Sequence, residues 1–242
     1  MIGYDIFKIH LLYIRILTDL GFDVEKEYDA SSVACLIAKS IDLDEPTHVI
    51  EDIKKSVKGH SAVVIGAGPS VENISIKDLS KYRVILCADG VCNLLNDLLC
   101  RSKICIYVGD LDGGINALKN TLSLGGYAFI HFHGDNYMDL ATKIPSVIRD
   151  FREKIIFTVQ SIPLCSRIIT LPGFTDGDRA IILTKILGVD QYNTVGMDLD
   201  DMFASKYSKP WYREKTVISS IKKRKLEWSK RIIDALGRGF LI

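Results

Sequence analysis

Short apolar runs that end in glycine and aspartate recur along this chain, and they constrain its fold more than any other feature. The clearest is Lys103–Gly114, in which β-branched and aromatic residues lead directly into Gly109, Asp110 and Asp112. An uninterrupted run of this kind indicates a strand buried on both faces of a parallel sheet. Comparable runs occupy residues 61–65, 83–88, 127–131, 154–159, 167–171 and 191–195.

Amphipathic stretches separate these runs and predict an α/β fold, with a mostly parallel sheet and helices on both faces. About a dozen residues join the runs at 83–88 and 104–108, which fits a right-handed strand–helix–strand crossover. We therefore expect 61–65, 83–88 and 104–108 to be neighbouring parallel strands. A small helical N-terminal segment, residues 1–58, precedes the catalytic α/β domain expected over 59–242, with its own helices expected at 6–20, 31–41 and after Pro46.

Composition narrows the partners and the compartment. The 31 basic residues nearly balance the 30 acidic ones, so the chain has no general attraction to nucleic acid or to a membrane. No run approaches the roughly 20 apolar residues that span a bilayer, and no signal-peptide pattern begins the sequence. The six cysteines form no Cys-x-x-Cys pair, so we expect buried, reduced thiols, no structural zinc and a cytoplasmic protein.

Asp110 and Asp112 are the strongest candidates for metal binding. Side chains alternate along an extended chain, so both carboxylates project to one side while Leu111 points away. Two acids at the carboxyl end of a strand suit Mg²⁺, which takes one or two carboxylates together with phosphate oxygens. A strand-to-helix turn in which Asp112 caps the next helix is the alternative.

The other strand ends carry further polar clusters. Gly66-Ala-Gly68-Pro69-Ser70 follows the first run, where glycine lets backbone amides approach phosphate or ribose; a plain turn is the alternative. Neither the dinucleotide fingerprint nor the Walker sequence is present there. The remaining clusters are Asp89-Gly90 with Asn93, His131 to Asn136 including Asp135, Thr175-Asp176-Gly177-Asp178-Arg179, and Gly196-Met197-Asp198-Leu199-Asp200-Asp201. With Gly109–Asp112, five strand ends carry both glycine and aspartate, which points to one acidic, phosphate-oriented cleft.

Two features allow more than one interpretation. His131 and His133 share a face of their strand, and we favour supporting or substrate contacts over metal ligation, because nitrogen ligands suit zinc or iron better than magnesium. The run Lys222–Lys225, placed before a terminal helix, is typical of a solvated helix face. Holding triphosphate charge is the alternative.

Taken together, the motifs resemble the archaeal 6-hydroxymethyl-7,8-dihydropterin pyrophosphokinases from about residue 60 to 230. The resemblance is carried by Gly66–Ser70, Ala88–Gly90, Gly109–Asp112, His133–Asn136 and Gly173–Ala180. Some of these motifs also resemble the thiamine pyrophosphokinases, which share the fold. Where the family would read Asp-x-Thr-Asp, this chain has Gly173-Phe174-Thr175-Asp176, so Asp135 or Asp178 is a candidate for the missing acid.

The resemblance implies transfer of a diphosphoryl group from ATP to a pterin hydroxymethyl group, with release of AMP. Asp110, Asp112 and Asp176 are then the expected Mg²⁺ ligands, and Asp89 either holds a second ion or accepts the hydroxyl proton. Arg179 and Lys206 are expected to balance phosphate charge. The full set of expected nucleotide- or substrate-binding residues is Gly66, Gly68, Pro69, Ser70, Gly90, Asn93, Asp135, Asn136, Thr175, Arg179 and Lys206.

The expected partners are ATP and a reduced pterin alcohol, in a pathway to a tetrahydromethanopterin- or tetrahydrofolate-type cofactor. Alternatives are a thiamine pyrophosphokinase, disfavoured because its C-terminal β-sandwich is missing, a nucleotide-sugar enzyme connected with flagellin glycosylation, and a non-catalytic nucleotide-binding module. The oligomeric state is left open, a homodimer included. Of the two acids near Arg179, we expect Asp176 to serve the site and Asp178 to stabilise the start of a helix.

Overall fold

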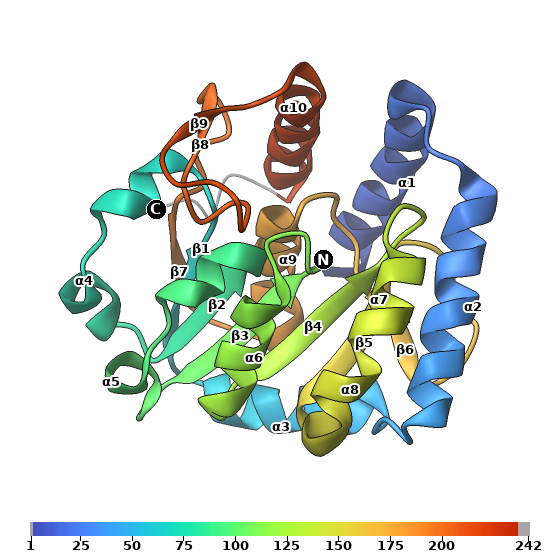
Figure 1. The fold of residues 1–242 in the computed structure, drawn as a ribbon, viewed down its shortest axis with the longest axis horizontal. Helices are drawn as coiled ribbons and strands as arrows, with labels where there is room; N and C mark the ends of the chain where they lie inside the picture. The colour runs from blue at the N-terminus through green and yellow to red at the C-terminus, as the bar shows by residue number, and fades with distance from the viewer. Residues whose placement is uncertain (1, 237–242) are drawn as a thin grey trace.

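The computed structural model describes residues 2–236, with only the backbone for residues 2–10 and 98. Its centre is a seven-stranded, all-parallel sheet in the order β6-β5-β4-β3-β2-β1-β7 (Figure 1). The strands are β1 Ser61–Ile65, β2 Val84–Ala88, β3 Ile104–Gly109, β4 Tyr127–Phe132, β5 Ile155–Val159, β6 Ile168–Thr170 and β7 Gln191–Val195. The predicted parallel neighbours β1, β2 and β3 are confirmed.

Helices cover both faces of this sheet, as the alternating apolar runs predict. On one face lie α2 Val24–Ser40, α6 Ile115–Ser123, α7 Tyr137–Lys143 and α8 Pro145–Ile148, together with the short α4 Ile76–Ser80 and α5 Asp97–Cys100. On the other lie α1 Ile2–Leu20, α3 Pro46–Val57, α9 Asp176–Leu187 and α10 Ser220–Ala235. Short 3-10 turns occupy Pro69–Asn73 (η1), Asp89–Leu94 (η2) and Arg149–Lys154 (η3).

The strand sequences explain why both faces are covered. Val63 and Ile65 of β1 belong to the core under α2 and α6, whereas Ala62 and Val64 belong to the core under α3 and α9. Alternate side chains point to opposite faces of a strand, so a strand that is apolar at every position needs a layer on each side. The N-terminal helices contribute to both cores, α1 and α3 to one and α2 to the other.

The strand order reverses once. From β1 to β6 each strand is added on the same side of the last, and α9 then crosses the opposite face to place β7 beside β1. Ligands of open α/β sheets bind at the carboxyl ends of the strands where such a reversal occurs. At that end Figure 1 shows α10 and a small antiparallel hairpin, β8 Phe203–Ala204 with β9 Thr216–Val217.

Several local expectations need correction. The second helix begins at Val24, where the Asp23 side chain caps it, and not at Ser31. The Lys222–Lys225 run lies inside α10 instead of preceding it. The segment after Asp89, expected to be one helix, divides into η2 and α5, and the expected helix that ends near Asp150 divides into α7, α8 and η3. The apolar face expected over residues 6–10 lies outside the described side chains.

The expectation of reduced cysteines is wrong for four of the six. Cys35 of α2 forms a disulfide with Cys165, and Cys87 of β2 forms one with Cys92; Cys100 and Cys105 are free and buried. The first disulfide joins positions 130 residues apart in the sequence. Sequence spacing cannot reveal such a pair, because the fold alone brings α2 beside the loop that follows β5.

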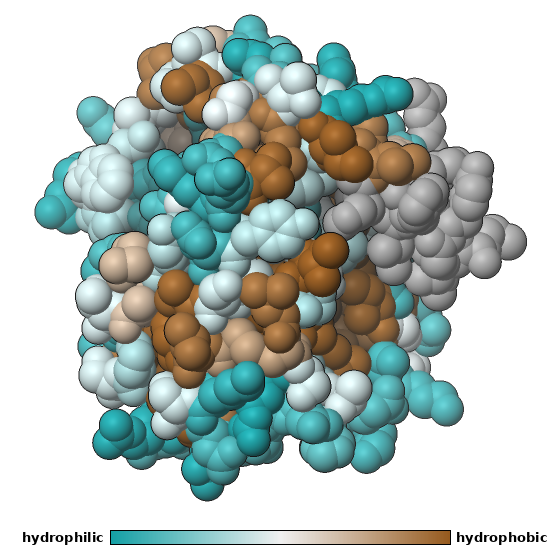
Figure 2. Space-filling model, turned by 90° about the vertical axis from the view of Figure 1, so that its right-hand side faces the viewer, coloured by the Kyte–Doolittle hydropathy of each residue, from teal (hydrophilic) through white to brown (hydrophobic). Residues whose placement is uncertain are grey.

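The side of the molecule formed by α1 and α2 carries exposed hydrophobic side chains (Figure 2). They include Tyr28 and Leu36 of α2 and, on the neighbouring loop, Ile162 and Leu164. Among the described helices, none is both long and apolar enough to cross a membrane.

Candidate functional site

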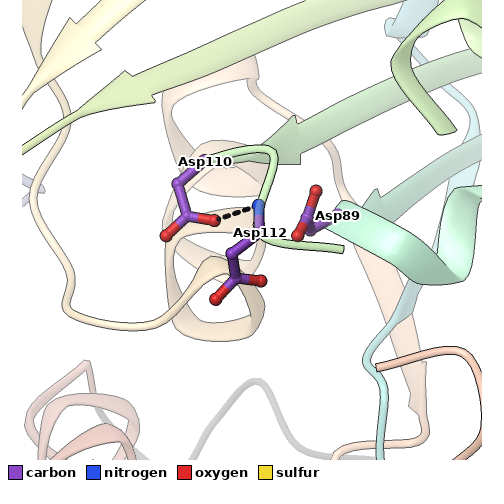
Figure 3. A group of neighbouring side chains, drawn as sticks. All are labelled: Asp89, Asp110 and Asp112. Carbon is purple, nitrogen blue, oxygen red and sulfur yellow. Dashed lines mark hydrogen bonds between the residues drawn. The ribbon is translucent and has the colours of Figure 1, made fainter. Parts of the chain in front are cut away.

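Three carboxylates converge where β2 and β3 end. Asp89 follows β2, and Asp110 and Asp112 follow β3; one oxygen of each lies within 4.8 Å of the others (Figure 3). The strands are adjacent and parallel, so their ends meet at one edge of the sheet. The predicted pairing of Asp110 with Asp112 is present, whereas Asp176, predicted as the third ligand, lies outside this group and Asp89 takes that place.

Asp89 is held by the backbone and by Tyr107. Its oxygens accept hydrogen bonds from the Tyr107 hydroxyl, at 2.5 Å, and from the Gly113 amide. Its φ of +49° turns the chain sharply out of β2, in a region where aspartate is among the better-tolerated residues. Burial, and then the negative charges of Asp110 and Asp176, raise the pKa of Asp89 well above its ordinary value.

Asp110 has the opposite electrostatic environment. One of its oxygens accepts the Asp112 amide at 3.1 Å, and the other lies 3.2 Å from Nε2 of His133. Burial alone would raise the pKa of Asp110, but hydrogen bonding and charge from His133 outweigh it, and the pKa is lowered. His133 therefore contacts an acid of the site, the kind of supporting contact that the sequence favours over metal ligation. His131 is buried and forms a hydrogen bond with Thr158.

Asp112 is the exposed member of the group and does not cap a helix. Its side chain contacts Nζ of Lys209. Burial lowers the pKa of Lys209, but the charge and hydrogen bond of Asp112, with the charges of Asp110 and Asp89, together raise it. The N-cap of α6 is Gly114, with a φ of +98° and no side-chain capping bond. The capping alternative for Asp112 is thereby excluded, and its carboxylate remains directed into the site.

A cleft, hereafter the glycine-loop cleft, opens beside these acids where β1, β2 and β7 end. It lies at the reversal of strand order, the position expected for a ligand. Its lining includes Gly66, Gly68, Asp89, Gly90, Asp112, Thr175, Asp176, Met197, Asp198, Phe203 and Lys222. The β8–β9 hairpin and α10 form its outer wall.

The glycines of this cleft are required by packing between loops. A Cβ at Gly66 would lie 2.5 Å from the carbonyl oxygen of Gly196, and one at Gly68 2.5 Å from Oδ2 of Asp198. The amides of Gly66 and Gly68 donate to the β7 chain, and the Ser70 amide donates to Asp198 at 2.8 Å. The backbone donors expected to face phosphate are thus already paired within the protein.

The start of α9 separates the roles of its two acids. Thr175 is the N-cap, and buried Asp178 completes a capping box, accepting hydrogen bonds from the amides of Phe174, at 2.6 Å, and Thr175, at 3.0 Å. Asp178 is therefore not the replacement acid for Gly173. Asp176 instead lines the cleft and pairs with Arg179 at 3.2 Å, and burial first, then Asp110, raises its pKa.

Five expected contact residues line neither of the clefts described for this structure, and one of them is Ser70, whose amide bonds Asp198. Asn136 supports the turn after β4 by bonding the backbone of His131 and His133. Asn93 donates to the Gly90 carbonyl, and Pro69 is buried at the start of η1. The exposed Lys206 lies over the Tyr207 ring. Lys209, three residues on, contacts Asp112 instead.

Other residues of the site were not among the candidates assigned from sequence. Asp198 lies in the Gly196–Asp201 cluster, which the strand-end pattern included, but no role was assigned to it. Lys222 and Lys225 belong to the basic run whose site role was the weaker interpretation. Glu27 and Gln160 line a second cleft with Asp110, Asp135 and Arg179, and no motif marks them.

The fold and the site define a doubly wound α/β protein with an acidic, oxygen-rich cleft at the carboxyl edge of its sheet. A family model described as 6-hydroxymethylpterin diphosphokinase MptE-like matches residues 39–202, and the chain belongs to this family. The 6-hydroxymethyl-7,8-dihydropterin pyrophosphokinase of Methanothermobacter thermautotrophicus is 32% identical over 232 residues, covering 93% of this chain and 92% of that protein. Proteins of the same name from Pyrococcus furiosus and Methanocaldococcus jannaschii are 30% and 29% identical, over 95% and 93% of this chain and 94% and 93% of their own length.

Proposed function

We propose that this protein transfers diphosphate from ATP to 6-hydroxymethyl-7,8-dihydropterin and releases AMP, in a Mg²⁺-dependent step of pterin cofactor synthesis of the tetrahydromethanopterin or tetrahydrofolate type. The observation that carries the proposal is the group Asp89, Asp110 and Asp112, set between two clefts at the carboxyl edge of the sheet. Relatives named for this reaction match nearly the whole chain, which supports the choice of substrates.

The glycine-loop cleft is the proposed nucleotide site. It lies at the strand reversal, and Lys222 on α10 supplies positive charge there. Lys209 beside Asp112 supplies a second cation at the acidic group. Triphosphate requires such cations, because charge accumulates on the leaving AMP and on the transferred group.

The acidic group fits a hard divalent cation. Its ligand atoms are all carboxylate oxygens, the type that Mg²⁺ prefers, and one or two carboxylates leave room for phosphate oxygens and water. Burial first, and then repulsion from neighbouring acids, raise the pKa of Asp89, and a bound cation would relieve that repulsion. Asp110, Asp112 and Asp89 would hold the ion, which supplies neutralisation of triphosphate charge.

The reaction balances with the groups present. The pterin hydroxyl oxygen forms a bond to the β-phosphorus, the bond from that phosphorus to the oxygen bridging the α-phosphate breaks, and AMP leaves with that oxygen. The hydroxyl proton passes to a carboxylate of the acidic group. Arg179 pairs with Asp176 and keeps that acid in place at the start of α9.

The test is incubation with ATP, Mg²⁺ and 6-hydroxymethyl-7,8-dihydropterin, followed by chromatography for AMP and mass analysis of the pterin product. We expect equal amounts of AMP and pterin diphosphate, abolished by EDTA. ADP in place of AMP would contradict the proposal. Product formation with thiamine, or with a nucleotide-sugar donor and no requirement for ATP, would replace it with one of the other activities.

A further inference from the structure

A second cleft, hereafter the aromatic cleft, lies on the opposite side of the acidic loop from the glycine-loop cleft. Asp110 lines the aromatic cleft, whereas Asp112, whose amide bonds Asp110, lines the other. The Asp176–Arg179 ion pair divides in the same way, with Asp176 in the first cleft and Arg179 in the second. A group bound in the aromatic cleft would therefore meet a nucleotide bound in the other at the acids.

Aromatic rings form much of this cleft. Tyr13 of α1, Phe22 of the α1–α2 connection and Phe174 before α9 line it, with the Phe22 and Phe174 ring centroids 6.0 Å apart. Nζ of Lys225 lies over both phenylalanine rings, 5.5 and 5.8 Å from their centroids. The two ring planes are tilted by 49°, so together they offer a flat ligand an apolar wall on one side.

Two polar side chains in the cleft are buried yet incompletely bonded. Glu27 is 6% exposed and Gln160 1% exposed. Oε1 of Glu27 accepts the Gly134 amide at 3.0 Å, and Oε1 of Gln160 accepts Nη2 of Arg179 at 3.0 Å. Within the described part of the chain, Oε2 of Glu27 and Nε2 of Gln160 have no hydrogen-bond partner.

These contacts fix the chemistry that the cleft offers. Since the Gln160 oxygen is committed to Arg179, its amide nitrogen is left as an unpaired donor at the cleft. Since one Glu27 oxygen is committed to Gly134, the other remains as an acceptor. Buried polar groups are nearly always paired, so a fixed acceptor and a fixed donor left open beside aromatic rings indicate a ligand that completes them.

We propose that the aromatic cleft binds the 2-amino-4-oxopyrimidine ring of the acceptor alcohol, an assignment that rests on the proposed function. The N3–H and 2-amino groups of that ring are adjacent, and the Glu27 carboxylate can accept hydrogen bonds from them. The 4-oxo group can accept a hydrogen bond from Nε2 of Gln160. Phe22 and Phe174 pack against one face of the ring, and the hydroxymethyl group points toward Asp110. Phosphate charge stays in the neighbouring cleft.

The assignment also gives the N-terminal helices a function. Tyr13, Phe22 and Glu27 precede residue 39, where the family-model match begins. The serine side chain of Ser161 donates to the Glu27 carbonyl at 3.0 Å, and the Cys35–Cys165 disulfide joins α2 to the same loop. Glu27 on α2 and Gln160 at the end of β5 are thus held together by this hydrogen bond and this disulfide.

The test compares Glu27→Gln with Glu25→Gln, a matched control on the exposed face of α2. Glu27→Gln keeps the side-chain size and one acceptor for Gly134. We expect it to raise the KM for the pterin at least 10-fold, with kcat and the KM for ATP within about 3-fold of wild type. The control should match wild type, and thermal melts confirm that both variants fold.

A substrate analogue makes the test specific. With a 6-hydroxymethyl pteridine that lacks the 2-amino group, wild type should lose at least 10-fold in kcat/KM, and Glu27→Gln should lose less than 3-fold. If the wild-type enzyme turns over but the KM for the pterin is unchanged in Glu27→Gln, the assignment of the cleft is wrong while the proposed function stands. If wild type neither releases AMP nor quenches pterin fluorescence on titration, both fail.

Discussion

The Tyr107 hydroxyl donates to Oδ1 of Asp89 at 2.5 Å and accepts the Leu111 amide at 3.2 Å. One buried side chain on β3 therefore links the turn after β2 to the turn that carries Asp110 and Asp112. The distances between Asp89 and the other two acids depend on this link, because neither turn is held by the hydrogen bonds between the strands.

Replacing Tyr107 with phenylalanine should loosen the acidic group. The change leaves Oδ1 of Asp89 and the Leu111 amide each without the Tyr107 hydroxyl, so we expect a loss of about 1–3 kcal/mol in the free energy of unfolding, and at least a 10-fold loss in kcat. Denaturant unfolding and AMP release measure the two effects. Tyr82→Phe, which removes a hydroxyl bonded to Asn193, is the control and should lose stability alone; equal kcat for both variants would contradict the link.

Asp110→Asn and Asp112→Asn should each lower turnover by roughly two orders of magnitude or more while the protein stays folded, because a neutral amide is a poor ligand for Mg²⁺. Circular dichroism and AMP release separate folding from catalysis. Asp139→Asn, on the surface of α7, should keep full activity. Full turnover in Asp112→Asn would show that its carboxylate serves only Lys209.

Asp176→Ala and Asp178→Ala should differ in kind. Asp176→Ala is expected to abolish AMP release at saturating Mg²⁺ with a small change in melting temperature. Asp178→Ala removes a capping box and leaves two amides unpaired, so it should cost about 1–3 kcal/mol of stability. Thermal melts and single-turnover assays on both variants check the division, which fails if Asp178→Ala melts like wild type.

The stability of the metal-free protein should fall as pH rises. Burial, and then Asp110 and Asp176, raise the pKa of Asp89 in the folded chain, so the folded state binds that proton more tightly than the unfolded state. The resulting stabilisation is complete below the unfolded value of about 3.9 and is lost as pH rises through the folded pKa. Melting in EDTA from pH 4 to 8 should therefore decline more steeply in wild type than in Asp89→Asn, and parallel curves would contradict this.

Reduction of the Cys35–Cys165 disulfide should lower the melting temperature. The bond closes a long stretch of chain, and such cross-links contribute about 2–4 kcal/mol. Calorimetry with and without a thiol reductant measures the effect. The Cys35→Ser/Cys165→Ser double variant should not show the fall in melting temperature that comes from this disulfide. An unchanged wild-type melt under complete reduction would show that packing of α2 suffices.

Sequence reasoning predicted the sheet well because its strands are unbroken apolar runs bounded by glycine. The bounds of β1 and β7 agree with the structure at both ends. It failed for η2 and α5, where hydrophobic spacing resembles one helix but the left-handed turn at Asp89 and a second cap at Asn96 divide it. The start of α2 was missed because its polar first turn shows no apolar face.

The site was predicted in part for the same physical reason. Asp110 and Asp112 lie two residues apart in one turn, so their carboxylates come close together, but Leu111 has a φ of +67° and the extended chain that the predicted alternation requires is not present there. Asp89 joins the acidic group because β2 lies beside β3, an arrangement that was predicted from sequence, although the third ligand was assigned to Asp176. Glu27 and Gln160 meet only through the packing of α2 against the end of β5, and no local pattern encodes that contact.

The contact between the first and last described helices has a consequence for synthesis. Oδ2 of Asp19 on α1 accepts the indole N–H of Trp228 on α10 at 2.8 Å, and Arg224 also bonds Asp19. Translation proceeds from the N-terminus, so α1 cannot form this contact until α10, more than two hundred residues later in the sequence, has been synthesised. Lys222 and Lys225 reach the clefts on that same final helix. A nascent chain whose α10 is still in the exit tunnel thus lacks these two lysines of its site, and we expect activity to begin only after α10 has left the tunnel.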